Sequence, residues 1–130
     1  MLRARRLADP RALRQHVRDI CLAYPETTER IQNPPHSGFL VREKTFCYYL
    51  NDHHGDGRLS LTFKAAQGAL GDFLEMDSAR FYKPPYMARH GWVGIYLDVE
   101  PIDWAFIEQV VLEAYQLTAP KKLAAMVGGK

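Results

Sequence analysis

The sequence predicts an α+β fold in which helices cover an antiparallel sheet. Residues 58–64 alternate strictly between polar and apolar side chains, which is typical of a strand with one buried face. Other segments rich in aromatic and β-branched residues follow one another through short polar turns, as in hairpins. Segments near both ends of the chain repeat their apolar residues at helical spacing instead. Hairpins and helices that share one core define the α+β class.

The first helix is predicted to begin at Asp9-Pro10, where an N-cap acid precedes a proline in the first turn, and to end before Pro25. Its apolar face consists of Leu13, Val17, Ile20, Cys21 and Tyr24. The opposite face carries a basic stripe formed by Arg11, Arg14 and Arg18. Residues 26–35 are polar, end in two prolines and are interpreted as a loop.

Strands are predicted next, over residues 36–41, 45–50 and 58–64, separated by polar turns at 42–44 and 51–57. A short helix over 65–76 follows, although its two glycines weaken it by about 1 kcal/mol each relative to alanine. The remaining elements are a brief strand at 80–83, a strand at 92–99, and a long helix that Asp103 caps and that ends near Thr118.

The composition fits one soluble domain. The 130 residues are 47% hydrophobic and 25% charged. We expect a single domain over residues 1–130, with a core from about 10 to 123 and a frayed tail at 124–130. The sequence has no stretch approaching the roughly 18 apolar residues of a membrane span, and no secretory signal. Cys21 and Cys47 lack zinc or disulfide spacing, so we expect reduced thiols and a cytoplasmic location.

The charge of the chain is unevenly distributed. The net charge is only +2, but residues 1–18 contain six arginines and a single acid. Such an arm suits contact with phosphates, and it equally suits a solvated face that aids solubility. Sequence alone leaves both interpretations open.

The sequence gives little support for a metal site or an enzyme active site. His53 and His54 share a turn with Asp52 and Asp56, but adjacent histidines are poor tetrahedral ligands, and a calcium loop would need an acid where Phe63 stands. The sequence has no phosphate-binding or nucleophile motif. We therefore expect no metal, no cofactor and no catalysis, with an enzyme that uses His90 as a general base as a remaining alternative.

Aromatic and basic residues are mixed within the twelve positions from Phe81 to Trp92, which suits stacking on planar groups together with phosphate pairing. The same aromatic residues would also serve as core residues on either side of a loop. Lys121 and Lys122 follow the last predicted helix, where cations interact favourably with the helix dipole or contact phosphates.

Three segments together resemble the MmcQ/YjbR family: residues 56–61, residues 85–93, and the stretch from Asp103-Trp104 to Leu123. The resemblance extends over about residues 10–123. It implies a CyaY-like (frataxin-like) two-layer α/β sandwich, in which the N- and C-terminal helices pack on one face of an antiparallel sheet. Members of the family are generally labelled DNA-binding proteins of a double-wing type. Iron binding is not implied, because the first helix carries arginines where an iron-binding ridge would need carboxylates.

We therefore expect a non-catalytic, monomeric module that binds DNA weakly through phosphates. The candidate contact residues are Arg42, Lys44, Arg58, Lys83, Tyr86, Arg89, His90, Trp92, Lys121 and Lys122. The alternative function is a small-molecule or peptide pocket, with the Tyr82–Trp92 loop as one wall.

Overall fold

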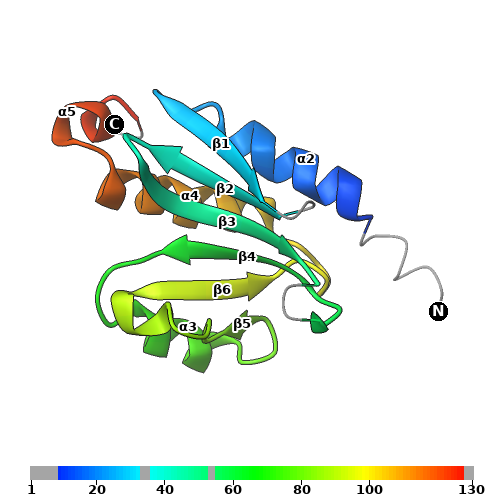
Figure 1. The fold of residues 1–130 in the computed structure, drawn as a ribbon. Coiled ribbons are helices and arrows are strands. Elements are labelled where there is room, and N and C mark those ends of the chain that lie inside the picture. The colour runs from blue at the N-terminus through cyan, green and yellow to red at the C-terminus, as the bar shows by residue number, and fades with distance from the viewer. Residues whose placement is uncertain (1–8, 33–35, 53–54, 128–130) are drawn as a thin grey trace.

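The fold was analysed in a computed structural model, which describes residues 9–32, 36–52 and 55–127 (Figure 1). Strands that are consecutive in sequence are combined with helices near both ends of the chain, as in an α+β fold. In chain order the elements are α2 (Pro10–Cys21), β1 (Thr27–Gln32), β2 (His36–Val41), β3 (Lys44–Asn51), β4 (Leu59–Lys64), α3 (Ala69–Met76), β5 (Phe81–Tyr82), the 3-10 helix η2 (Ala88–His90), β6 (Trp92–Tyr96), α4 (Trp104–Thr118) and α5 (Lys121–Ala125).

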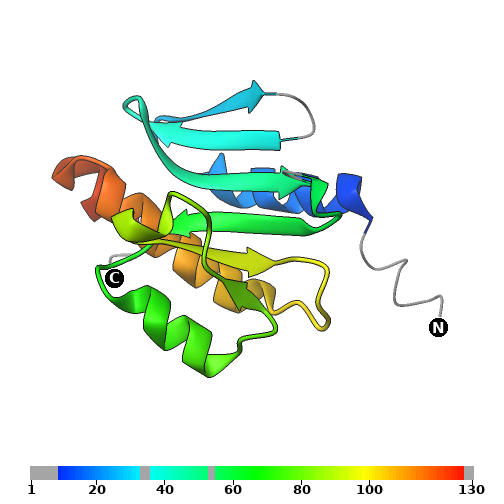
Figure 2. The ribbon, with the colours of Figure 1, turned by 60° about the horizontal axis from the view of Figure 1, so that its bottom comes forward.

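The strands form one open sheet in the order β1-β2-β3-β4-β6-β5, and every neighbouring pair is antiparallel. Helices α2 and α4 cover one face of this sheet (Figure 2). Helix α3 lies near β5 and reaches the same core, since the rings of Phe73 and Phe106 are 6.1 Å apart. The predicted two-layer sandwich, with the N- and C-terminal helices on one face, is confirmed.

The core lies between the sheet and these helices. Strand β4 contributes Leu59, Leu61 and Phe63, as its alternating pattern predicts. Helix α4 contributes Ile107, Val110, Val111 and Ala114, which is the predicted apolar stripe. Both cysteines are free and buried in this core, in agreement with their expected role as small apolar residues.

The predicted helix starts are also confirmed. The Asp9 carboxylate accepts a hydrogen bond from the backbone N–H of Arg11 at 3.1 Å, and Asp103 accepts one from Phe106 at 3.1 Å. Each acid satisfies an N–H that has no partner inside its helix, which is the usual reason for an acidic N-cap.

The prediction of a loop at 26–35 is wrong for residues 27–32, which form the edge strand β1. Its sequence is polar because most of the strand faces solvent, so composition indicated a loop. Its β-branched residues Thr27, Thr28 and Ile31 suit an extended backbone, and β2 supplies the hydrogen-bonding partner. Pro34 and Pro35 lie outside the described residues.

The C-terminal tail also differs from the prediction. Lys121 and Lys122, which were predicted to follow the long helix, begin the short helix α5 directly after Pro120. Leu123 is buried and fixes α5 against the core, because it gives the short helix an apolar contact. Residues 124 and 125 are therefore helical rather than frayed, while residues 128–130 lie outside the described part of the chain.

Two further elements, helix α3 and strand β6, are shorter than predicted. Helix α3 begins at Ala69 rather than Ala65, because Gly68 adopts a positive φ of 87° and interrupts the helix. Strand β6 ends at Tyr96 rather than Val99. Of the predicted 51–57 turn, Asn51 belongs to β3, and His53 and His54 are not among the described residues.

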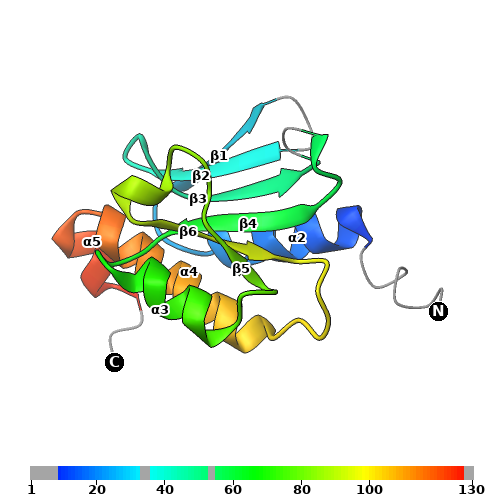
Figure 3. The same ribbon diagram turned by 90° about the horizontal axis from the view of Figure 1, so that it is seen from below.

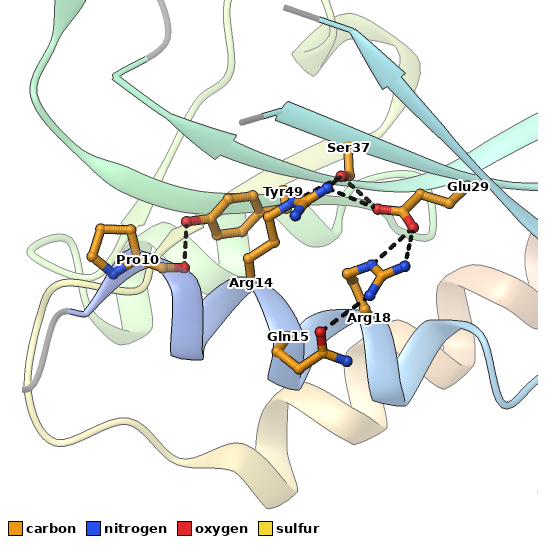
Figure 4. Close-up of polar contacts among 7 residues, drawn as sticks. All are labelled: Pro10, Arg14, Gln15, Arg18, Glu29, Ser37 and Tyr49. Carbon is orange, nitrogen blue, oxygen red and sulfur yellow. Dashed lines mark hydrogen bonds and ion pairs between the residues drawn. The ribbon is translucent and has the colours of Figure 1, made fainter. Parts of the chain in front are cut away.

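Two arginines of the predicted basic stripe of α2, Arg14 and Arg18, share one carboxylate of β1 (Figure 4). Arg18 donates to Glu29 of β1 at 2.8 Å, and Arg14 donates to Glu29 at 3.3 Å and to Ser37 of β2 at 3.0 Å. The hydroxyl of Ser37 donates to the same carboxylate at 2.7 Å. These contacts attach the edge strand to the first helix. Arg14 and Arg18 are therefore structural rather than free to contact phosphates.

Among the helices of the described residues, none has the length and apolarity needed to cross a membrane.

The Glu29 cluster gives a stability prediction. Glu29→Gln removes the charge that two guanidinium groups share, and the carboxylate is only 9% exposed. We expect the free energy of unfolding in urea to fall by about 1–3 kcal/mol. Glu43→Gln, at an exposed turn position without an ion pair among the described residues, is the control, and we expect it to change stability by less than about 0.5 kcal/mol. Equal effects of the two substitutions would contradict a structural role for Glu29.

Candidate functional site

One row of residues crosses all six strands on the sheet face that α2 and α4 leave uncovered. The strand register aligns Arg30, Gly38, Tyr48, Thr62, Gly94 and Tyr82 from β1 to β5. Side chains in register point to the same face of a sheet, so this row lies opposite the helices. We call this face the open face.

The two glycines of the row make room for its two tyrosines. A Cβ added at Gly94 would lie 2.3 Å from Cζ of Tyr82, and a Cβ at Gly38 would lie 3.0 Å from Cε1 of Tyr48. Each tyrosine ring therefore lies flat over a neighbouring glycine. Any larger residue at Gly94 would displace the Tyr82 ring.

A stack of planar groups continues from Tyr82 along this face. The rings of Tyr82 and Tyr96 stack with centroids 4.6 Å apart, and the Arg58 guanidinium lies 3.6 Å from the Tyr96 centroid. Burial raises the pKa of Tyr82 to about 12, and this effect is partly offset by the hydrogen bond that its hydroxyl shares with Ser60 at 2.8 Å. Asp98 ends the stack, with an Oδ1 atom 2.7 Å from Nη2 of Arg58.

The open face is hollowed into two adjoining cavities of about 270 and 380 Å³. Leu50, Thr62 and Met87 line both, so we treat the two as one cleft. The segment between β5 and η2 rises on the side of the sheet away from the helices, as Figure 3 shows, and contributes Pro84, Pro85 and Met87 to the cleft wall. This agrees with the alternative prediction that the Tyr82–Trp92 loop forms a pocket wall.

Several predicted cations gather at one end of the sheet. Strand β3 begins at Lys44, and the antiparallel strand β4 ends at Lys64, so these two lysines lie at the same end of the sheet. Strand β6 also begins at this end, directly after η2. Helix α5 lies at this same end of the molecule, at the left of Figure 1. We call this region the basic end and define it by Lys44, Lys64, Arg89, His90, Lys121 and Lys122. Within the described chain, none of their side chains takes part in an ion pair.

The opposite end of the sheet is acidic. The turn between β3 and β4 carries Asp52 and Asp56, and the connection from β6 to α4 carries Asp98, Glu100 and Asp103. Arg58 and Arg80 at this end are ion-paired with Asp98 and Asp77. Cations without an ion pair among the described residues thus gather at the Lys44 end, where Glu26 is paired with Arg42 and Glu43 is the neighbouring acid, although the whole chain has a net charge of only +2.

The remaining predicted contact residues have mixed environments. Arg42, in the β2–β3 turn, donates to Glu26 at 3.1 Å, and this hydrogen bond holds the pKa of Glu26 below its usual value. Trp92 is only 9% exposed and contacts Tyr48 at a centroid distance of 5.6 Å, so it packs rather than presents a free ring. Tyr86 is 84% exposed, with a positive φ of 67°. Lys83 is exposed and lines the cleft.

The family assignment rests on sequence and fold together. A family model described as YjbR matches residues 22–117, which is most of the chain. The chain belongs to the YjbR family. The resemblance stated from the sequence is thereby confirmed. No curated protein matches the chain.

Two solved structures share the YjbR fold seen here. One is the crystal structure of protein DR2400 from Deinococcus radiodurans, a domain of the family DUF419, with a TM-score of 0.66 and 15% identity over 89% of this chain and 80% of that chain. The other is a protein from Pseudomonas syringae, with a TM-score of 0.67 and 15% identity over 81% of this chain and 97% of that chain. At such identity the similarity shows the fold alone.

The described part of this YjbR chain offers no group of three His, Cys, Asp or Glu side chains able to hold a metal ion. The His90 side chain is exposed and makes no hydrogen bond with another described residue.

Sequence reasoning missed three residues that matter here. Arg30 was hidden in a segment interpreted as a loop. Lys64 and Thr62 belong to the strand predicted at 58–64, for which only the apolar face was assigned a role. Their signal was the alternation itself, because every second residue of 58–64 must point away from the core.

The Arg58–Asp98 pair makes stability depend on pH. Burial alone would raise the pKa of Asp98, but hydrogen bonds from Arg58 and from the Leu59 N–H outweigh burial and lower the pKa below its ordinary value. A lowered pKa adds stability above the ordinary value of about 3.9, and this stability is lost as the pH falls. We expect Asp98→Asn to lower the free energy of unfolding at neutral pH by about 1–3 kcal/mol, and the difference to shrink below about pH 4.

Urea denaturation across this pH range measures the effect. Glu75→Gln on the exposed side of α3 is the control, since no ion pair joins Glu75 to another described residue. The ionic role of Asp98 would be contradicted if the free energies of unfolding of Asp98→Asn and of the unsubstituted protein differed by the same amount in acid as at neutral pH.

Proposed function

We propose that this YjbR protein is a non-catalytic binding protein whose basic end contacts the phosphates of duplex DNA without sequence preference. The observation that carries the proposal is the gathering of exposed cations from β3, η2 and α5 at one end of the sheet. Elements far apart in sequence thus bring cations to the same end of the molecule, and phosphate contacts supply most of non-specific DNA affinity.

The distribution of acids supports the same choice of surface. Asp52, Asp56 and Asp98 lie at the far end of the sheet, where they would repel a phosphate backbone. Among the described residues, this distribution of acids favours the approach of a polyanion at the basic end. Glu43, in the β2–β3 turn, is the exposed acid nearest to Lys44 in sequence and weakens this field locally.

The ion pairs change the list of expected contacts. Arg42 and Arg58 are engaged by Glu26 and Asp98, so the proposal no longer relies on them. Lys44, Arg89, Lys121 and Lys122 remain the main phosphate contacts, and His90 and the exposed ring of Tyr86 are neighbours available for hydrogen bonding and stacking. The proposal also includes a monomer located in the cytoplasm, as the sequence led us to expect.

Salt dependence tests this proposal. Binding of fluorescent duplex DNA, followed by anisotropy, should weaken linearly in a plot of log K against log salt concentration, with a slope of about −0.9 for each phosphate contact. In the double variant Lys121→Gln, Lys122→Gln, we expect the slope to become shallower by about 0.9 for each lysine that contacts a phosphate.

Arg11→Gln is the matched control, because Arg11 is an exposed cation in the first turn of α2, and α2 begins at the end of the molecule opposite to α5 (Figure 1). We expect it to leave the slope unchanged. Absence of binding at low salt, an affinity indifferent to salt, or an equal response to the control and the lysine variant would each contradict the proposal.

A further inference from the structure

The cleft on the open face contains a polar group that the protein leaves without a partner. Thr62 is only 1% exposed, yet its hydroxyl Oγ1 makes no hydrogen bond within the described structure. Thr27 has the other such buried hydroxyl among the described residues, and Thr62 lines both cavities of the cleft. A buried polar atom without a partner costs about 1–3 kcal/mol, so its placement at a cavity calls for a ligand.

Thr62 occupies the middle of the row across the sheet. Its strand neighbours on either side are Tyr48 and Gly94, and Gly94 lies beneath the Tyr82 ring. The rings of Tyr48 and Tyr82 each lie against a glycine of this row, and Thr62 lines both cavities. Leu50 and Met87 complete a largely apolar surround on both sides of Thr62.

The two halves of the cleft differ in charge. The half next to β1 is lined by Arg30, which is exposed and has no ion pair with a described residue, and no carboxylate lines this half. The half next to β5 is lined by Lys83, but Asp56 lines it as well and offsets its charge. The net positive charge of the cleft is therefore at the Arg30 side.

We propose that this cleft binds a small organic acid with a flat apolar body. The carboxylate of the ligand pairs with Arg30, its apolar body lies between Tyr48, Leu50 and Met87, and a polar atom of the ligand hydrogen-bonds to the Thr62 hydroxyl. The cavity volumes of about 270 and 380 Å³ suit a ligand of this size. This site is separate from the basic end and does not depend on DNA binding.

Naphthoate, an aromatic carboxylate, is the probe for this proposal. Titration of the full chain, followed by two-dimensional NMR of the backbone amides, should shift the resonances of Thr62, Leu50 and Met87 most strongly. Naphthamide has the same shape without the charge. We expect naphthamide to bind roughly tenfold more weakly, because it loses the charge-assisted contact with Arg30.

Three variants assign the parts of the site. Thr62→Val keeps the side-chain volume and removes the hydroxyl, and should weaken naphthoate roughly 3- to 10-fold. Its melting temperature should stay the same or rise, because the hydroxyl has no partner to lose. Arg30→Gln should weaken naphthoate roughly tenfold and leave naphthamide unchanged. Lys83→Gln is the matched cation control on the other half of the cleft and should alter naphthoate affinity less than twofold.

Several results would overturn the inference. The inference is wrong if naphthoate does not bind at millimolar concentration, if naphthoate and naphthamide bind with equal affinity, or if the amide shifts are centred away from Thr62. A larger effect of Lys83→Gln than of Arg30→Gln would likewise overturn the assignment of the carboxylate. Saturating duplex DNA should leave naphthoate binding unchanged, and displacement of naphthoate by DNA would show that the two surfaces are one nucleic-acid site.

Discussion

Helices cover only one face of the sheet, and the other features of the molecule depend on this constraint. The covered face buries Leu61, Phe63 and Val93 beneath α4, as an antiparallel sheet with a single apolar face requires. The open face has no helix to fill it, so it is built from aromatic side chains lying over glycines and from the segment between β5 and η2. A cleft remains because these rings lie along the sheet rather than standing upright from it.

The ion pairs of the protein have structural roles at its periphery. Glu29 joins β1 to α2, and Asp98 fixes Arg58 over Tyr96 at the end of the ring stack. Each pair neutralises an arginine that would otherwise count toward an anion-binding surface. What remains exposed and unpaired at one end of the described sheet is a lysine-rich surface, and lysine side chains are flexible point charges that suit non-specific contact with phosphates.

The two proposed binding surfaces use different chemistry and can be separated by experiment. The basic end attracts polyanions over a distance through charge, and its contacts are screened by salt. The cleft excludes water from a small apolar volume, and there a single charge and an unpartnered hydroxyl select the ligand. Both surfaces are built on the YjbR fold, which this chain shares with the Deinococcus and Pseudomonas proteins. At 15% identity, the similarity shows the fold and gives no information about either surface.

The sequence by itself determined the class of fold, the family, the capped starts of α2 and α4, and the strands β2, β3 and β4, because caps and apolar periodicity are local signals. It did not determine β1, since an exposed edge strand is polar and is recognised only by its partner strand. It also named the cations without showing which are neutralised: Glu26 lies 16 residues from Arg42, and Asp98 lies 40 from Arg58. Only the tertiary structure decides such pairs, and the row through Thr62, because they depend on strand register between distant segments.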